Sequence, residues 1–189
     1  MTSFRHLGDD LVHRGYVWRV VVAEFEAPDG SRFTRDVVRS PGAVAAVPVH
    51  RGADGAPVVT MVRQYRAPLD QHVLEIPAGM RDVADEPTEV TAARELVEEV
   101  GLEPGRLVPL TRFSPSVGMT DAELFVYLAL DLRRVARDVH GPEEVHMDVV
   151  EIPLADAAAM VVSGEIHDAK SIIGILLAER FVRDGGQWE

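Results

Sequence analysis

The chain has 189 residues, enough for one ordinary domain with a buried core. It contains no cysteine, which excludes disulfides, thiolate metal sites and cysteine nucleophiles. Its formal net charge of −12 argues against nucleic acid as a partner, because an acidic surface repels phosphate backbones.

The hydropathy pattern excludes a membrane role. No segment of the sequence approaches the length of unbroken apolar residues that a membrane span needs, and the first ten residues lack the apolar core of a secretory signal. We therefore expect a cytoplasmic protein without a membrane partner.

The first forty residues are expected to form a β-hairpin. Two apolar, β-branched runs, 16–25 and 33–38, flank a stretch of turn residues at 27–31. We predict an N-terminal strand region over residues 1–40, which could serve dimerisation, and a second domain over residues 41–189.

The second domain is expected to mix strands and helices without a regular alternation. Strands are predicted at 43–49, 58–65, 72–76, 107–113, 124–130 and 149–153. Helices are predicted at about 87–100, 154–163 and 168–184. This order favours an α/β (α+β) sandwich built on a mixed sheet.

The helix at 87–100 has the clearest signals. Asp85 or Glu86 can cap its start, and Pro87 suits a first-turn position. Gly101 suits the left-handed residue that ends a helix. The apolar stripe expected to pack on the core consists of Val90, Ala93, Leu96, Val97 and Val100.

One face of this helix gathers carboxylates. Glu95, Glu98 and Glu99 stand at positions i, i+3 and i+4, where like charges repel. A hard cation such as Mg²⁺ would turn that repulsion into ligation, because it prefers oxygen ligands. Arg94 can hold one of these carboxylates in place. The alternative reading is a solvated acidic face, which is common on surface helices.

The residues around this helix carry a longer pattern. Gly79 is followed by six residues, Glu86, seven residues and then the segment 94–102. This resembles the Nudix box, in which five residues separate the glycine from the glutamate. Asp85 would restore the first spacing but spoil the second, so the register of the loop stays open. The segment 94–102 matches the box at every specified position.

The resemblance implies a Nudix α/β/α sandwich with a loop–helix–loop metal site for Mg²⁺, with Mn²⁺ as an alternative. Glu95 and Glu99 correspond to the principal metal ligands, and the carbonyl of Ala78 to a further oxygen ligand. Glu98 corresponds to an auxiliary ligand or hydrogen-bonding partner, and Arg94 to the residue that orients the carboxylates.

Flanking segments are similar to the ADP-ribose pyrophosphatase branch of the family. They are Gln64-Tyr65-Arg66 and the run 74–79 that leads into the box. The resemblance implies that Arg66 grips the diphosphate, for which a guanidinium fork is suited; the alternative is a surface arginine at a strand end. Glu75 would bind the substrate ribose, contact the groups that surround the metal ligands, or form a structural salt bridge.

Further substrate contacts are implied by the same resemblance. The loop 114–123, with Gly118, resembles the loop placed over the substrate. Glu143 or Glu144 would serve as general base or bind a metal, and the sequence does not choose between them. Trp18, with Tyr16, is a candidate for stacking on adenine, although strand aromatics are usually core residues.

The expected activity is Mg²⁺-dependent hydrolysis of ADP-ribose to AMP and ribose 5-phosphate by a homodimer. One alternative is another small nucleoside diphosphate substrate of the family, either a nucleotide sugar or a dinucleoside polyphosphate. A second alternative is a non-catalytic Nudix-fold protein that senses ADP-ribose.

Overall fold

The protein, described by a computed structural model over residues 3–138 and 145–188, divides into two compact units. The first comprises residues 1–42 and 113–123, and the second residues 43–112 and 124–189. Across the described ranges, no helix is long and apolar enough to cross a membrane.

The first unit is a three-stranded antiparallel sheet in the order β1-β2-β3. Its strands are β1 (Arg5–Arg14), β2 (Arg19–Glu26) and β3 (Arg32–Arg39). β2 and β3 form the predicted hairpin, and the carboxylate of Asp29 closes its turn by accepting the Ser31 backbone N–H at 2.9 Å. β1 is an addition to the prediction, because its largely charged and exposed residues give no apolar alternation.

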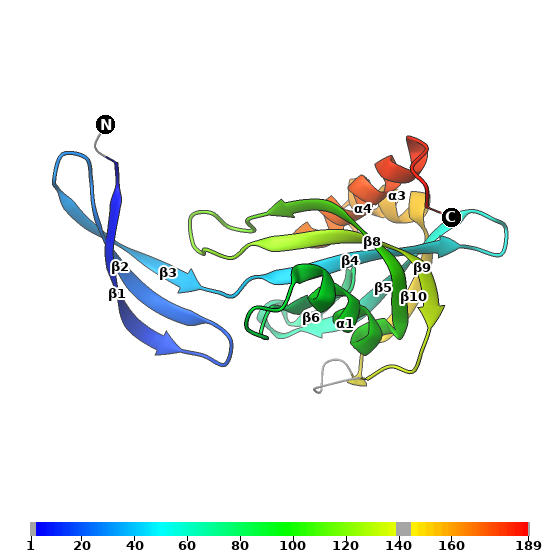
Figure 1. The fold of residues 1–189 in the computed structure, drawn as a ribbon, viewed down its shortest axis with the longest axis horizontal. Helices are drawn as coiled ribbons and strands as arrows, with labels where there is room; N and C mark the ends of the chain where they lie inside the picture. Colours follow the sequence, from blue (N-terminus) through cyan, green and yellow to red (C-terminus); the bar gives the residue numbers. More distant parts are fainter. Residues whose placement is uncertain (1–2, 139–144, 189) are drawn as a thin grey trace. The chain divides into compact units, whose positions relative to one another are not determined.

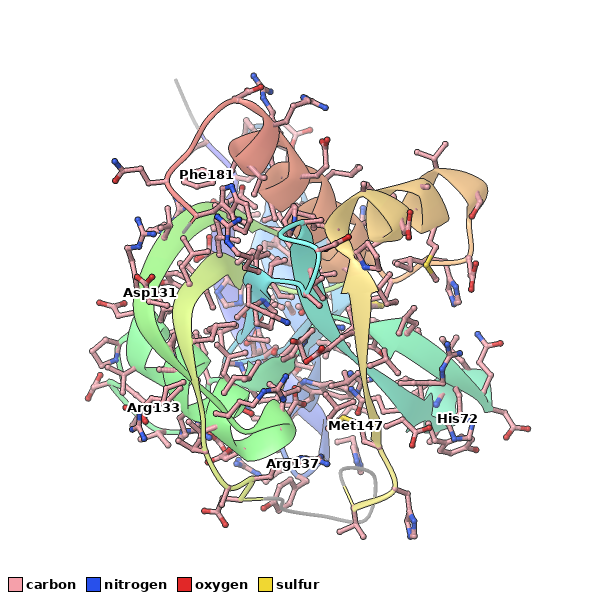
Figure 2. All side chains as sticks on the ribbon, turned by 90° about the vertical axis from the view of Figure 1, so that its right-hand side faces the viewer. His72, Asp131, Arg133, Arg137, Met147 and Phe181 are labelled. Carbon is pink, nitrogen blue, oxygen red and sulfur yellow. The ribbon has the colours of Figure 1, made fainter. Side chains whose placement is uncertain are left out.

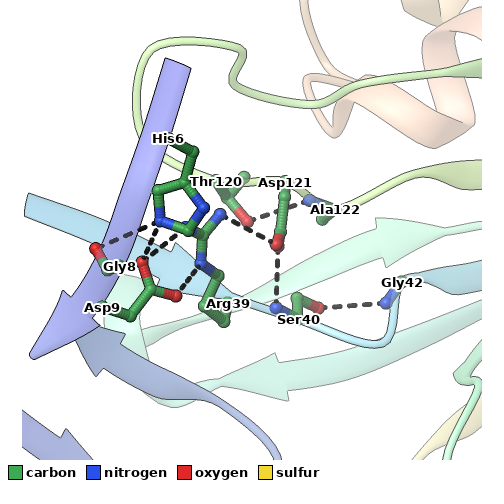
Figure 3. Close-up of polar contacts among 9 residues, drawn as sticks. All are labelled: His6, Gly8, Asp9, Arg39, Ser40, Gly42, Thr120, Asp121 and Ala122. Carbon is green, nitrogen blue, oxygen red and sulfur yellow. Dashed lines mark hydrogen bonds and ion pairs between the residues drawn. The ribbon is translucent and has the colours of Figure 1, made fainter. Parts of the chain in front are cut away.

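An ion network within this unit is centred on Arg39 at the end of β3 (Figure 3). Its Nε and Nη2 donate to the carboxylate of Asp9 on β1 at 2.9 and 2.8 Å, and Nη1 donates to Asp121 at 3.2 Å. Asp121 also accepts the Ser40 backbone N–H at 3.0 Å. The hydrogen bond from Arg39 lowers the pKa of Asp9 to about 2. The network therefore ties the 113–123 segment to the sheet of its own unit.

The second unit is built on a seven-stranded mixed sheet. Its strands are β4 (Ala43–Arg51), β5 (Pro57–Arg66), β6 (Gln71–Glu75), β7 (Ala78–Met80), β8 (Leu102–Phe113), β9 (Leu124–Arg134) and β10 (Asp148–Pro153). The main order is β10-β5-β4-β9-β8, with β6 paired to β5 and β7 to β4. β4 and β9 are parallel, whereas β5 is antiparallel to β4, β6 and β10.

Helices cover both faces of this sheet (Figure 1). They are α1 (Thr88–Val100), α3 (Leu154–Ser163) and α4 (Ala169–Arg183), with a short 3-10 turn, η1 (Ala67–Leu69), after β5. Val44 of β4 packs with Ala92 of α1, whereas Val47 meets Gly174 of α4 on the opposite face. The predicted α/β/α sandwich with a mixed sheet is confirmed.

The core on the α1 side joins residues far apart in the chain. Met147, labelled in Figure 2, lies just before β10 and is buried. It belongs to the cluster formed by Ala46, Val62, Leu96, Val100, Leu102, Ala129 and Met147. This cluster holds α1 against the sheet and so positions its acidic face.

The start of α1 differs from the prediction. Pro87 is the cap residue, with φ −59° and ψ 142°, and neither Asp85 nor Glu86 caps the helix with its side chain. The Pro87 carbonyl accepts the backbone N–H groups of Val90 at 3.0 Å and Thr91 at 3.1 Å. The fixed φ of proline suits this junction, but its side chain has no oxygen to accept a first-turn N–H, so Pro87 provides no side-chain cap.

The buried face of α1 is also rotated from the predicted stripe. Val90 is 49% exposed, although the apolar pattern predicted that it packs on the core. Leu96 and Val100 are buried as predicted, and the buried face also includes Thr91, Ala92 and Glu99. Gly101 ends the helix with φ 66°, the left-handed conformation that its position predicted.

Candidate active site

Arg94 lies at the centre of a carboxylate cluster on α1 and the loop before it. Its Nη1 donates to Glu95 at 2.9 Å and to Glu98 at 3.0 Å. Its Nη2 donates to Glu86 at 3.4 Å and Asp82 at 3.5 Å. Burial opposes the charge on Arg94, but the carboxylates of Glu95, Glu98 and Glu86 outweigh it and raise the pKa of the guanidinium. A permanently charged Arg94 thus orients the carboxylates around it.

The loop before α1 contains one residue more than the Nudix box. Asp85 is exposed and has φ 61°, the left-handed region that aspartate tolerates better than most residues. Glu86 turns toward the helix, where the Thr91 hydroxyl and then Arg94 lower the pKa of its carboxyl group. Of the two candidates Asp85 and Glu86, it is therefore Glu86 that contacts Arg94.

Ala78 and Gly79 of β7 meet two of the predicted metal ligands. The Ala78 backbone N–H donates to the Glu99 carboxylate at 2.9 Å, and Glu99 is only 4% exposed. A Cβ on residue 79 would overlap the carboxyl group of Glu95. Glycine at this position therefore lets the Glu95 carboxylate approach the backbone directly, beside the peptide that binds Glu99.

The donor set fits a hard divalent cation. The side chains that converge here offer carboxylate oxygens, the ligands that Mg²⁺ prefers. Within residues 3–138 and 145–188, no three acidic or histidine side chains form a preformed metal cage. Mg²⁺ does not require one, because it commonly uses one or two carboxylates together with water and substrate phosphate.

A second charged network lies where β5 and β6 meet α4. Arg66 grips the Glu75 carboxylate with Nε at 2.6 Å and Nη2 at 2.7 Å. Lys170 donates to Oε2 of Glu75, the oxygen that Arg66 Nη2 also contacts, and to Asp168 at 3.0 Å. Glu75 is 2% exposed; burial opposes its charge, but Arg66 and Lys170 outweigh this and hold its pKa below the usual range. The salt bridge, one of the alternatives for Glu75, is thus formed.

A groove of about 490 Å³ lies over this network. Its lining includes Arg66, Leu69, Val73, His167, Asp168 and Lys170. The hydrogen bond to Glu75 is the main cause of the raised pKa of Arg66, and the negative charge of Glu99 adds to it. The arginine at the groove is therefore within electrostatic reach of the acidic helix.

The remaining predicted contacts belong to the first unit or to residues outside the described ranges. Trp18 is 55% exposed and Tyr16 is fully exposed in the turn between β1 and β2. Gly118 lies in an exposed turn, also in the first unit, and a Cβ there would meet nothing within 4 Å. Glu143 and Glu144 lie outside the described residues.

Sequence reasoning missed Lys170 and Asp168. Asp168 caps α4 by accepting the Ser171 backbone N–H at 3.0 Å, a common helix-start signal that carries no functional information. Lys170 is separated from Glu75 by 95 residues, so no local pattern links the two. The one available signal is that Lys170 is the only lysine in the chain.

Comparisons with known proteins identify the family and the fold. Residues 39–172 match the NUDIX domain. The chain is 37% identical over 174 residues to the ADP-ribose pyrophosphatase of Mycobacterium tuberculosis, covering 92% of this chain and 82% of that protein. It is 36% identical over 169 residues to the ADP-ribose pyrophosphatase of Bacillus subtilis, covering 89% of each. The crystal structure of an ADP compounds hydrolase superposes with a TM-score of 0.81 at 22% identity, over 98% of this chain and 97% of that one.

Proposed function

Because the chain belongs to the Nudix family and is a pyrophosphohydrolase, we propose that it hydrolyses ADP-ribose to AMP and ribose 5-phosphate with Mg²⁺. Two ADP-ribose pyrophosphatases that match nearly the whole chain support this substrate. The observation that carries the chemistry is the convergence of Glu95 and Glu99 on the backbone of Ala78 and Gly79.

In this proposal the metal is held by Glu95, Glu99 and the Ala78 carbonyl. Mg²⁺ is the first choice because the donor set consists of oxygen, and Mn²⁺ is the alternative. When bound, the divalent ion neutralises charge that develops on the phosphates and makes an attacking water more acidic. Arg94 and Glu98 keep the carboxylates oriented, as their hydrogen bond at 3.0 Å supports.

Arg66 binds the diphosphate. Its side chain is 39% exposed and lines the groove, and because Nε and Nη2 bind Glu75, Nη1 is the nitrogen proposed to bind phosphate oxygens. A guanidinium held on one edge by a buried carboxylate is fixed in plane, which lowers the entropy lost on binding an anion.

The remaining roles are assigned from family resemblance. Glu143 or Glu144 removes a proton from the attacking water. Trp18 and Tyr16 stack on adenine, and the loop with Gly118 covers the substrate. The proposed domains are the strand region 1–40 and the hydrolase domain 41–189, with the segment 113–123 in the same compact unit as the strand region.

We also infer that the protein is a cytoplasmic homodimer that pairs through its N-terminal strands. Exposed Phe4, Leu11 and Val12 on or beside β1 support an apolar contact there. Sedimentation equilibrium tests it: a mass of one chain at micromolar concentration would contradict the dimer.

The substrate is tested by a panel of ADP-ribose, a nucleotide sugar such as GDP-mannose and a dinucleoside polyphosphate. Each is incubated with Mg²⁺, and the products are identified by ³¹P NMR. We expect ADP-ribose to be turned over fastest, giving AMP and ribose 5-phosphate. Negligible turnover of ADP-ribose beside fast turnover of another compound would overturn the choice of substrate. Tight binding of ADP-ribose without any hydrolysis would support the sensing alternative.

A further inference from the structure

Lys170 occupies an unusual place for the only lysine among 19 basic residues. It lies in the first turn of α4 and is 8% exposed, whereas lysine is rarely buried unless it is paired. Its ammonium group donates to Glu75 and to Asp168. The buried ammonium group therefore compensates the negative charges of the two carboxylates that it contacts.

The network holds two positive and two negative charges. Glu75 accepts from Arg66 at both carboxylate oxygens and from Lys170 at Oε2, and Lys170 also binds Asp168. Asp168 attracts Arg66 as well, since its charge is among the causes that raise the pKa of that guanidinium. Lys170 therefore neutralises the carboxylate that would compete with Glu75 for Arg66.

The geometry argues against direct contact between Lys170 and a substrate. Only 10% of its side chain is exposed, and its ammonium already faces two carboxylates. A hydrogen-bond chain also anchors this end of α4: the Ser171 hydroxyl donates to Asp168 at 2.6 Å and accepts the Ile76 backbone N–H at 2.9 Å. Lys170 is thus held in a fixed position beside the end of β6.

We propose that Lys170 is a positioning residue for substrate binding: it fixes the Glu75 carboxylate, which in turn holds the Arg66 guanidinium at the groove in the plane needed to bind a diphosphate. The inference rests on the proposed role of Arg66. A lysine suits this position because its compact ammonium reaches two carboxylates, whereas a planar guanidinium would need more space.

The first test replaces Lys170 by methionine, which removes the charge and keeps a similar length. Using whichever nucleoside diphosphate the wild-type protein hydrolyses in the panel, we measure kcat and KM, and the Kd by calorimetry without metal. Both KM and Kd are expected to rise roughly tenfold, with little change in kcat. A lower kcat at unchanged KM would indicate a merely structural role and overturn the inference.

A double-mutant cycle with Arg66 distinguishes a role of Lys170 in positioning Arg66 from a general loosening of the structure. In the Arg66→Ala background, Lys170→Met is expected to raise KM less than about twofold further, because the group that it positions is gone. The same rise in KM with and without Arg66 would contradict the inference. The matched control is Arg180→Met on the same helix, for which KM should not change, because its side chain is 71% exposed and pairs with the exposed Asp184 at 3.4 Å.

Two further outcomes distinguish this inference from its premise. If Arg66→Ala leaves KM unchanged, the proposed role of Arg66 is wrong and the inference falls with it. If Arg66→Ala raises KM and Lys170→Met does not, only the inference falls. Should Lys170→Met fail to fold, the double variant Glu75→Gln with Lys170→Gln removes one buried charge of each sign; a KM equal to the wild-type value would then overturn the inference.

Discussion

At the scale of single residues, the site depends on how closely charged groups approach the backbone. The Glu95 carboxylate occupies the space where a side chain at position 79 would begin. The N–H of the neighbouring residue, Ala78, donates to the Glu99 carboxylate. This bond matters because burying a carboxylate without a partner would be costly. Gly79 and Arg94 therefore help to place the Glu95 carboxylate, and the Ala78 N–H helps to place that of Glu99.

Gly79→Ala should reduce hydrolysis about 100-fold, because the new methyl group displaces the Glu95 carboxylate and misplaced catalytic groups lose rate at this order. The melting temperature should change little, since the position lies on a partly exposed short strand. Steady-state kinetics and thermal unfolding measure the two effects. Gly8→Ala is the control, because a Cβ there meets nothing within 4 Å.

The Glu75 network predicts a pH-dependent stability. Its partners hold the pKa of Glu75 below 4.5 in the folded state, so its contribution is present above that pH and is lost as the pH falls through the folded value. Glu75→Gln should cost about 3 kcal/mol at neutral pH, because it leaves Arg66 and Lys170 without their shared carboxylate.

Urea unfolding of this variant at several pH values tests the sign. The difference from the wild-type protein should be largest at neutral pH and should shrink below pH 4.5. A difference that grows toward acid would contradict the assignment. Glu179→Gln, which breaks an exposed pair with Arg183 at 2.9 Å on α4, should have little effect at any pH.

At the scale of elements, local sequence signals predicted α1 closely but did not predict β1 or β7. α1 was predicted at 87–100 and spans 88–100. The agreement is close because a proline marks its start and a glycine marks its end. β1 was not predicted, since a charged, exposed strand is stabilised by pairing with β2 and not by its own pattern. β7 was missed for a similar reason: three residues pair with β4, too few for any periodicity.

The end of α1 offers a test at this scale. Gly101 has φ 66°, and a Cβ there would lie 2.7 Å from the Val135 carbonyl oxygen. Gly101→Ala should therefore destabilise the protein by about 1 to 3 kcal/mol, from left-handed strain and the close contact. Urea unfolding measures the change; an unchanged free energy of unfolding would show that the helix end relaxes without cost.

At the scale of the whole molecule, the site combines elements that are distant in the sequence. The acidic face of α1 could be predicted because its residues share one helix and one spacing pattern. A salt bridge was only one of the alternatives for Glu75, and its partners Arg66 and Lys170 were not foreseen, because β5, β6 and α4 meet only in the folded chain. Such contacts depend on sheet order and helix packing, which the sequence does not show residue by residue.

The net charge of −12 also acts on the whole molecule. Substrates with a diphosphate are anionic, so the acidic surface repels them while Arg66 and a bound cation attract them locally. Both the metal and Arg66 are therefore expected to contribute to binding as well as to the reaction.

The most direct test of the account is the hydrolysis of ADP-ribose by the Glu99→Gln variant, compared with the wild-type protein. The substitution keeps the size of a side chain that is 4% exposed and removes one charge that would hold the cation. We predict that kcat with saturating Mg²⁺ falls at least about 100-fold while the melting temperature is retained, and that a chelator abolishes wild-type activity until Mg²⁺ is restored. A Glu99→Gln variant that hydrolyses ADP-ribose within about twofold of the wild-type rate would contradict the assignment of the acidic helix as the metal site.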